Sequence, residues 1–106
     1  MPPPKPFIVE VGTTVIGAVA FTGWDYGMAV AFGIFRPNGD YIPSEHATVL
    51  EGRELLNLDR LRITWADGRP LACDAVGLLD YATTAGDDGR EVTAFGVRDT
   101  AFLNSS

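Results

Sequence analysis

Apolar and polar residues alternate with a period of two along much of this chain, most clearly between residues 15 and 35. This segment reads VIGAVAFTGWDYGMAVAFGIF and contains the string AVAF twice, at 18–21 and 29–32. A period of two is typical of a β-strand, because successive side chains of a strand point to opposite faces of the sheet. The segment therefore predicts a β-hairpin whose loop runs from Thr22 to Gly27.

The predicted hairpin has a bulky face and a smooth face. We place its strands antiparallel with Ala20 opposite Ala29, so that residues of similar size share a face. The bulky face then consists of Val15, Val19, Phe21, Met28, Val30, Phe32 and Ile34. The smooth face consists of Ile16, Ala18, Ala20, Ala29, Ala31 and Gly33. We expect the bulky face to enter the core and the smooth face to let another surface approach the backbone closely.

Three further segments carry Asn or Asp immediately before Gly, between two strand-like runs. This pair is a strong hairpin signal, because both residues tolerate the positive φ angles of tight turns. The parity of the flanking apolar residues favours three-residue loops at 37–39, 66–68 and 87–89.

The middle turn shows how parity decides the loop length. A two-residue loop at 67–68 would place Asp74 on the core face, where a carboxylate is costly. A three-residue loop sets Ile63 opposite Leu71 instead. It also puts Gly68 in the left-handed conformation, which glycine adopts without strain.

The other two turns follow the same rule. The loop at 37–39 sets Phe35 opposite Tyr41, and the loop at 87–89 sets Tyr81 opposite Phe95. For the two later hairpins we expect the inward residues to be Leu61, Ile63, Trp65, Leu79, Tyr81 and Phe95.

These patterns predict an all-β fold. The expected strands are 6–11, 14–21, 28–36, 40–43, 47–52, 60–65, 69–79 and 90–98. At most one short helical turn is expected, near 52–58, where the apolar residues are too few for a longer helix. We predict a small single-domain β-sandwich or β-barrel of about seven or eight short, mostly antiparallel meander strands.

Composition narrows the class of protein. The 106 residues suit one domain, 1–106, with an extended proline-rich lead-in at 1–5 and a frayed tail at 104–106. A net charge of −6 argues against binding to nucleic acid and favours a basic partner. The single cysteine allows no internal disulfide, and no apolar run is long enough to span a membrane, so we expect a cytoplasmic protein.

The candidate binding residues are those of the first hairpin. Trp24, Asp25 and Tyr26 form its predicted loop, and exposed aromatic residues on a loop are typical binding anchors. The alternative is that Trp24 or Tyr26 folds back to cap the core. The smooth face adds Ala18, Ala20, Ala29, Ala31 and Gly33 as a second candidate surface, with packing inside the domain as its alternative.

The other reactive residue types do not form a recognisable site. His46 is the only histidine, and it could act as a general base only with a carboxylate such as Asp25, Asp40, Glu45 or Asp74. Cys73 is interpreted as a small buried residue. Asp87 and Asp88 occupy turn positions that aspartate favours for backbone reasons. We therefore predict no metal site, no cofactor and no catalytic residue.

Three hypotheses about function follow. The first is a non-enzymatic protein-binding or assembly module, whose partner is a second copy or a basic protein. The second is a β-barrel that binds a small apolar ligand. Its lining would come from Phe21, Phe32, Phe35, Tyr41, Trp65, Tyr81 and Phe95. The third is an enzyme that uses His46. The first is preferred, because no catalytic constellation is visible and the large apolar residues are needed for the core.

Overall fold

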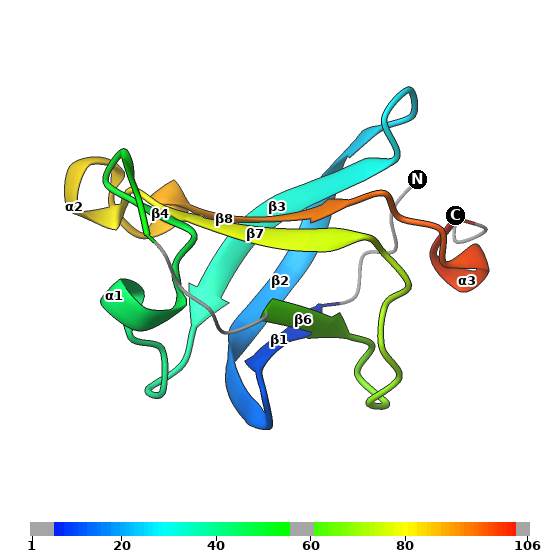
Figure 1. Cartoon of the computed structure of the whole chain (residues 1–106), viewed down its shortest axis with the longest axis horizontal. Helices are drawn as coiled ribbons and strands as arrows, with labels where there is room; N and C mark the ends of the chain where they lie inside the picture. Colours follow the sequence, from blue (N-terminus) through cyan, green and yellow to red (C-terminus); the bar gives the residue numbers. More distant parts are fainter. Residues whose placement is uncertain (1–5, 56–60, 104–106) are drawn as a thin grey trace.

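Eight strands form one curled sheet in the order β5-β4-β7-β8-β3-β2-β1-β6 (Figure 1). The computed structural model describes residues 6–55 and 61–103. The strands are β1 (Phe7–Val11), β2 (Thr14–Asp25), β3 (Val30–Pro37), β4 (Val49–Leu50), β5 (Arg53–Glu54), β6 (Leu61–Thr64), β7 (Ala75–Asp80) and β8 (Arg90–Phe95). The short helices are α1 (Pro43–His46), α2 (Ala82–Ala85), the 3₁₀ turn η1 (Asp87–Gly89) and α3 (Thr100–Leu103).

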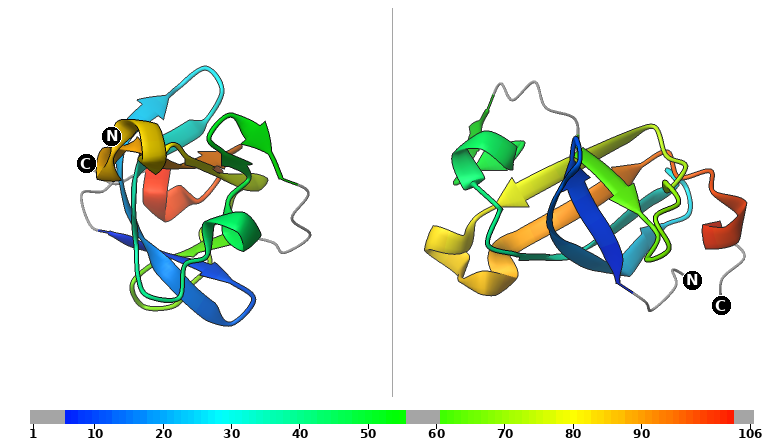
Figure 2. Two further views of the ribbon diagram at one scale, coloured as in Figure 1. Left: turned by 90° about the vertical axis from the view of Figure 1, so that its left-hand side faces the viewer. Right: turned by 90° about the horizontal axis from the view of Figure 1, so that it is seen from below.

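The sheet curls into a half-barrel, which an end-on view shows most clearly (Figure 2). Strands β1, β2 and β3 form an antiparallel meander, and β3 continues the sheet to β8 and β7. The pairing of β4 with β7 is parallel. The prediction of a small all-β domain is confirmed. Unlike in a simple meander, several strands pair with strands that do not adjoin them in the sequence.

The core lies on the concave face of the half-barrel and is closed at one end by α3. Phe102 of α3 is buried, and its ring centroid lies 5.7 to 5.8 Å from those of Phe7, Phe21 and Trp24. Asp99 holds α3 in place, because its carboxylate accepts hydrogen bonds from the backbone N–H groups of residues 101 and 102. Aromatic packing of this kind contributes both buried area and ring-to-ring contacts.

The first hairpin forms, but its predicted register is wrong. Ala20 pairs with Ile34 rather than with Ala29, and β2 continues to Asp25 before the chain turns. A β-bulge lies between Phe21 and Gly23. Before the bulge, over residues 17–21 of β2, the register differs from the predicted one by an odd number of residues. The side chains of β3 therefore point to the opposite face from the one expected beside Val19 and Phe21.

The middle turn is confirmed in detail. The Leu71 N–H donates to the Ile63 carbonyl at 2.9 Å, and the Trp65 N–H donates to the Arg69 carbonyl at 2.8 Å. Gly68 has a φ of +92°, the left-handed conformation that was predicted. The strand expected at 69–79 nevertheless begins only at Ala75, because the chain leaves β6 to pair with β8.

The turn at 37–39 does not lead into a returning strand. Asn38 ties it to β2 instead, since its side-chain Nδ2 donates to the Val15 carbonyl at 2.7 Å. The edge of β3 that does not pair with β2 pairs with β8, so this edge is not available to residues 40–43. Phe35 and Tyr41 still meet, with ring centroids 5.1 Å apart.

The turn at 87–89 is also different from the prediction. The helices α2 and η1 lie between β7 and β8, and Asp80 pairs directly with Arg90 across these two strands. Leu78 and Val92 face the core and are fully buried, whereas Tyr81 and Phe95 are exposed. The predicted inward set is therefore right for Ile63 and wrong for three apolar residues of the last hairpin, Leu79, Tyr81 and Phe95.

In the described part of the helical turn expected near 52–58, residues 52–55 are not helical. Glu51 and Gly52 form a two-residue turn with φ angles of +47° and +84°, and β5 follows at once. Residues 56–58, the lead-in 1–5 and the tail 104–106 lie outside the described residues. In the part of the chain that the structure describes, the helices are too short to cross a membrane.

Candidate functional site

The tip of the β2–β3 hairpin extends beyond the rest of the sheet (Figure 1). Tyr26 and Met28 lie at this tip with 79% and 71% of their surface exposed, the largest values among the exposed large hydrophobic residues of the described chain. Asp25 fixes the turn, because its Oδ1 accepts the N–H groups of Gly27 at 2.9 Å and of Met28 at 3.2 Å. The tip therefore presents two apolar side chains on an ordered turn.

Trp24 supports the tip rather than forming it. It belongs to β2, and its half-buried ring packs 5.7 Å from the Phe102 ring. It also makes an edge-to-face contact with Tyr26 at 5.8 Å. Of the three predicted loop residues, Trp24 thus caps the core, Asp25 shapes the turn and Tyr26 is exposed.

The predicted smooth face does not exist as one surface. Ala31 and Gly33 are buried in the concave face together with Ile16, whereas Ala18 and Ala20 lie on the convex face. Their separation follows from the register of β2 and β3. Gly33 is packed so closely that a Cβ there would overlap the carbonyl of Ala20. Ala29 sits in the turn with a φ of +54°.

The convex face of the sheet is apolar where a polar surface is usual. An antiparallel sheet with one solvated face normally alternates apolar and polar residues. Here Phe32 and Phe95 point outward with 38% and 44% of their surface exposed. The aromatic set predicted to line an internal pocket is therefore divided, since Phe21 and Phe35 are in the core while Phe32, Tyr81 and Phe95 are exposed.

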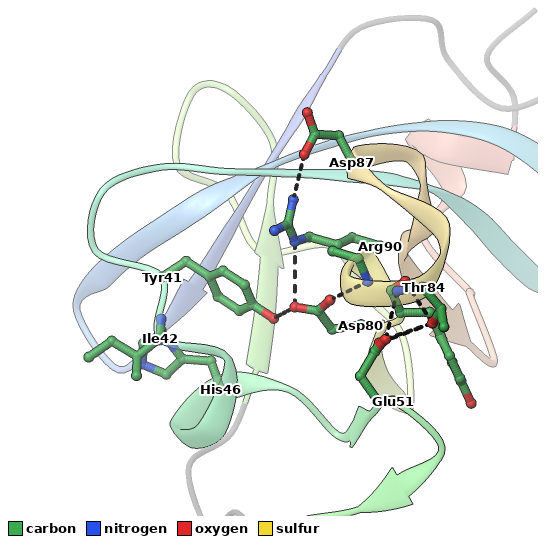
Figure 3. A network of polar contacts seen from close by, with 10 residues as sticks. Tyr41, Ile42, His46, Glu51, Asp80, Thr84, Asp87 and Arg90 are labelled. Atoms are coloured by element: carbon green, nitrogen blue, oxygen red, sulfur yellow. Dashed lines mark hydrogen bonds and ion pairs between the residues drawn. The ribbon is translucent and has the colours of Figure 1, made fainter.

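A polar network closes the end of the half-barrel that is opposite the hairpin tip (Figure 3). Asp80, at the end of β7, is only 2% exposed. The Tyr41 hydroxyl donates to its Oδ2 at 2.6 Å, and the Ala82 N–H donates to its Oδ1 at 2.9 Å. Arg90 neutralises the buried carboxylate, with its Nε 3.4 Å from Oδ2.

The chemistry of this network is that of a structural tie. Burial, together with the hydrogen bond to Asp80, raises the pKa of Tyr41, so its hydroxyl remains a donor. Both oxygens of Asp80 already accept hydrogen bonds from within the chain. Glu51 adds a second link, since it accepts hydrogen bonds from the backbone and the hydroxyl of Thr84. The network joins β7, β8, α2 and the segments on either side of α1.

The sequence also indicates this network, although the pattern of apolar residues alone does not reveal it. Asp80 follows Leu78 at a spacing of two, so it shares the buried face of β7. A carboxylate at such a position requires a buried partner, and Arg90 is the first cation after it in the chain. Reading polar residues by parity would have found the pair.

His46 has a local role in the structure. Its Nδ1 accepts the N–H of Ile42 at 3.0 Å, and its ring lies 6.0 Å from that of Tyr41. Within the described residues, no ion pair joins His46 to a carboxylate. Asp25 lies at the opposite end of the sheet, and Asp74 is paired with Arg98.

The remaining candidates also have structural partners. Cys73 is half-buried, and burial raises the pKa of its thiol, which disfavours the reactive thiolate. Asp87 and Asp88 form ion pairs with Arg90 and Arg36. No group of three or more metal-binding side chains occurs in residues 6–55 and 61–103.

Comparison of the chain with models of protein families, with curated proteins and with solved structures finds no match.

Proposed function

We propose that this protein is a non-enzymatic protein-binding module that contacts a partner through the tip of the β2–β3 hairpin. The observation that carries the proposal is the exposure of Tyr26 and Met28 on a turn held by the side chain of Asp25. Tyrosine and methionine are enriched in protein interfaces, where they contribute large contact areas.

Preorganisation favours binding by this tip. The backbone of the turn is fixed by Asp25, and the strand that leads into it is anchored by Trp24 against Phe102. Little conformational entropy is lost when such a rigid loop meets a partner, so more of the contact energy becomes affinity.

The charge of the chain favours a basic protein as this partner. The net charge is −6, and the tip itself carries the carboxylate of Asp25. Opposite charges accelerate association and select against acidic competitors. An acidic partner at the tip would meet repulsion from the rest of the molecule.

Site-specific photo-crosslinking tests the proposal. Tyr26 is replaced by a photoreactive phenylalanine derivative in the organism that makes the protein, and adducts are identified by mass spectrometry. Tyr81, an exposed tyrosine at the other end of the sheet, is replaced in the same way as the control. We expect a discrete basic protein to be captured from position 26 only, and Met28→Ser to abolish the adduct.

Binding measurements with the purified captured protein then test whether Tyr26 contributes to the affinity. We expect Tyr26→Ser to weaken its affinity by about tenfold or more, as removal of an interface anchor does. Identical adducts from positions 26 and 81, or no adduct from position 26, would contradict the proposal.

A further inference from the structure

The convex face of the sheet carries the second inference. We call the outward residues of its four central strands the outer face. They are Ala18, Ala20 and Gly23 of β2, Phe32, Ile34 and Arg36 of β3, Glu91, Thr93 and Phe95 of β8, and Ala75, Gly77 and Leu79 of β7. Only Arg36 and Glu91 are charged, and their charges are opposite. The outer face is therefore electrically neutral in a molecule whose net charge is −6.

Aromatic rings cover the glycines of the outer face. The Phe32 ring covers Gly23 of the neighbouring strand, where a Cβ would overlap it. The Phe95 ring lies 3.5 Å from the position that a Cβ on Gly77 would take. Contiguous exposed apolar patches with a polar rim are typical of contacts between proteins.

The two charges decide which partner fits. A basic surface would bring like charge to Arg36, and an acidic surface would do the same at Glu91. A surface that carries one of each, in the same arrangement, satisfies both. We propose that the outer face binds a second copy of this chain about a twofold axis, so that Glu91 of each protomer pairs with Arg36 of the other.

The partners that these residues have within the chain leave room for this pairing. Arg36 forms an ion pair with Asp88 at 3.1 Å in which both side chains are largely exposed, and such pairs are weak. Glu91 accepts a hydrogen bond from the Thr93 hydroxyl at 3.2 Å on the same strand. Both side chains can therefore turn toward a second protomer at small cost.

Sedimentation equilibrium over a wide concentration range tests the proposal with the intact protein. We expect a monomer–dimer equilibrium, in which Glu91→Arg or Arg36→Glu raises the dissociation constant about tenfold or more. The double variant, which exchanges the two charges, should restore the dimer. Rescue by the exchanged pair is not expected if either substitution only disturbs the fold.

Matched controls separate this contact from net charge. Glu54→Arg and Arg53→Glu make the same charge changes at exposed positions of β5, outside the outer face, and should leave the dimer unchanged. Glu91→Arg also lowers the net negative charge, so general repulsion alone would predict a tighter dimer for this variant. A monomer at all concentrations, or a dimer insensitive to both outer-face substitutions, would overturn the proposal.

The test is independent of the proposed function. The hairpin tip and the outer face share none of their residues, so Tyr26→Ser should not change the dissociation constant of the dimer. Loss of the photo-adduct with an intact dimer, or the reverse, would identify which proposal fails.

Discussion

The two ends of the half-barrel use their side chains in opposite ways. At the end with α1 and α2, the carboxylate of Asp80 is buried and is satisfied by Tyr41, Arg90 and a backbone N–H. At the end with the hairpin tip, Tyr26 and Met28 are apolar and are exposed to solvent. The charged and hydroxyl groups at the end with α1 and α2 thus stabilise the fold. The end with the hairpin tip is the one through which we propose that the protein binds a partner.

This comparison shows that residue chemistry alone does not locate a site. A buried ionised group must be compensated within the fold, since its desolvation is costly. Exposed apolar groups lower the solubility of a protein, so an ordered turn that presents two of them is a candidate contact surface. Substitutions at the two ends should therefore differ sharply in their effects on stability.

The largest effect is expected from Asp80→Ala. It leaves the Arg90 side chain without its buried counter-charge and should lower the free energy of unfolding by about 3–5 kcal/mol, measured by urea denaturation. Asp87→Ala is the control, because it removes the exposed partner of the same arginine and should cost about 1 kcal/mol or less. Equal effects of the two substitutions would refute the structural role of Asp80.

A smaller effect is expected from Tyr41→Phe, which removes one hydrogen bond to a carboxylate and should cost about 1–3 kcal/mol. This substitution should also change the way in which the stability of the protein depends on pH. The pKa of Tyr41 is raised in the folded state, so above about pH 10 the unfolded state loses the proton first and stability falls. Denaturation curves between about pH 9 and 11 should show a shallower loss in the variant than in the original protein. Identical slopes would show that the Tyr41 hydroxyl is not held by Asp80.

The smallest effect is expected at the hairpin tip. Tyr26→Ser and Met28→Ser together should change the free energy of unfolding by about 0.5 kcal/mol or less, because neither side chain is part of the core. Trp24→Ser in the same hairpin should cost about 2 kcal/mol or more, since its ring packs against Phe102. Thermal or urea denaturation of the two variants gives the comparison, and a strongly destabilised tip variant would mean that the tip is structural.

Local patterning predicted the elements of this fold better than their partners. Seven of the eight expected strands correspond to strands in the structure, although several boundaries differ, and the turn around Gly68 formed as expected. These features depend on neighbours in the chain. The alternation of side chains and the conformation of a glycine turn act over a few residues, so a single sequence is enough to reveal them.

The candidate site was predicted only in part. Tyr26 lies in the hairpin turn as expected, whereas Asp25 is the last residue of β2 and holds the turn through its side chain. Met28 lies exposed at the tip, not on the bulky core face where it was expected. The error came from the register of β2 and β3. One bulge and the turn capped by Asp25 shift the pairing, and an odd shift exchanges the two faces of β3.

The sequence by itself determined where the chain is extended, where it turns at Gly68, and that it forms a single all-β fold. The tertiary structure decided which face of each strand is buried, because that depends on pairing between β3 and β8 and on the docking of α3 by Phe102. It also decided that Asp80 could be buried beside the partly buried Arg90, since the two charges compensate each other only when β7 and β8 are aligned. The buried faces and the Asp80–Arg90 pair depend on contacts between residues far apart in the chain, which the local pattern of apolar and polar residues does not predict.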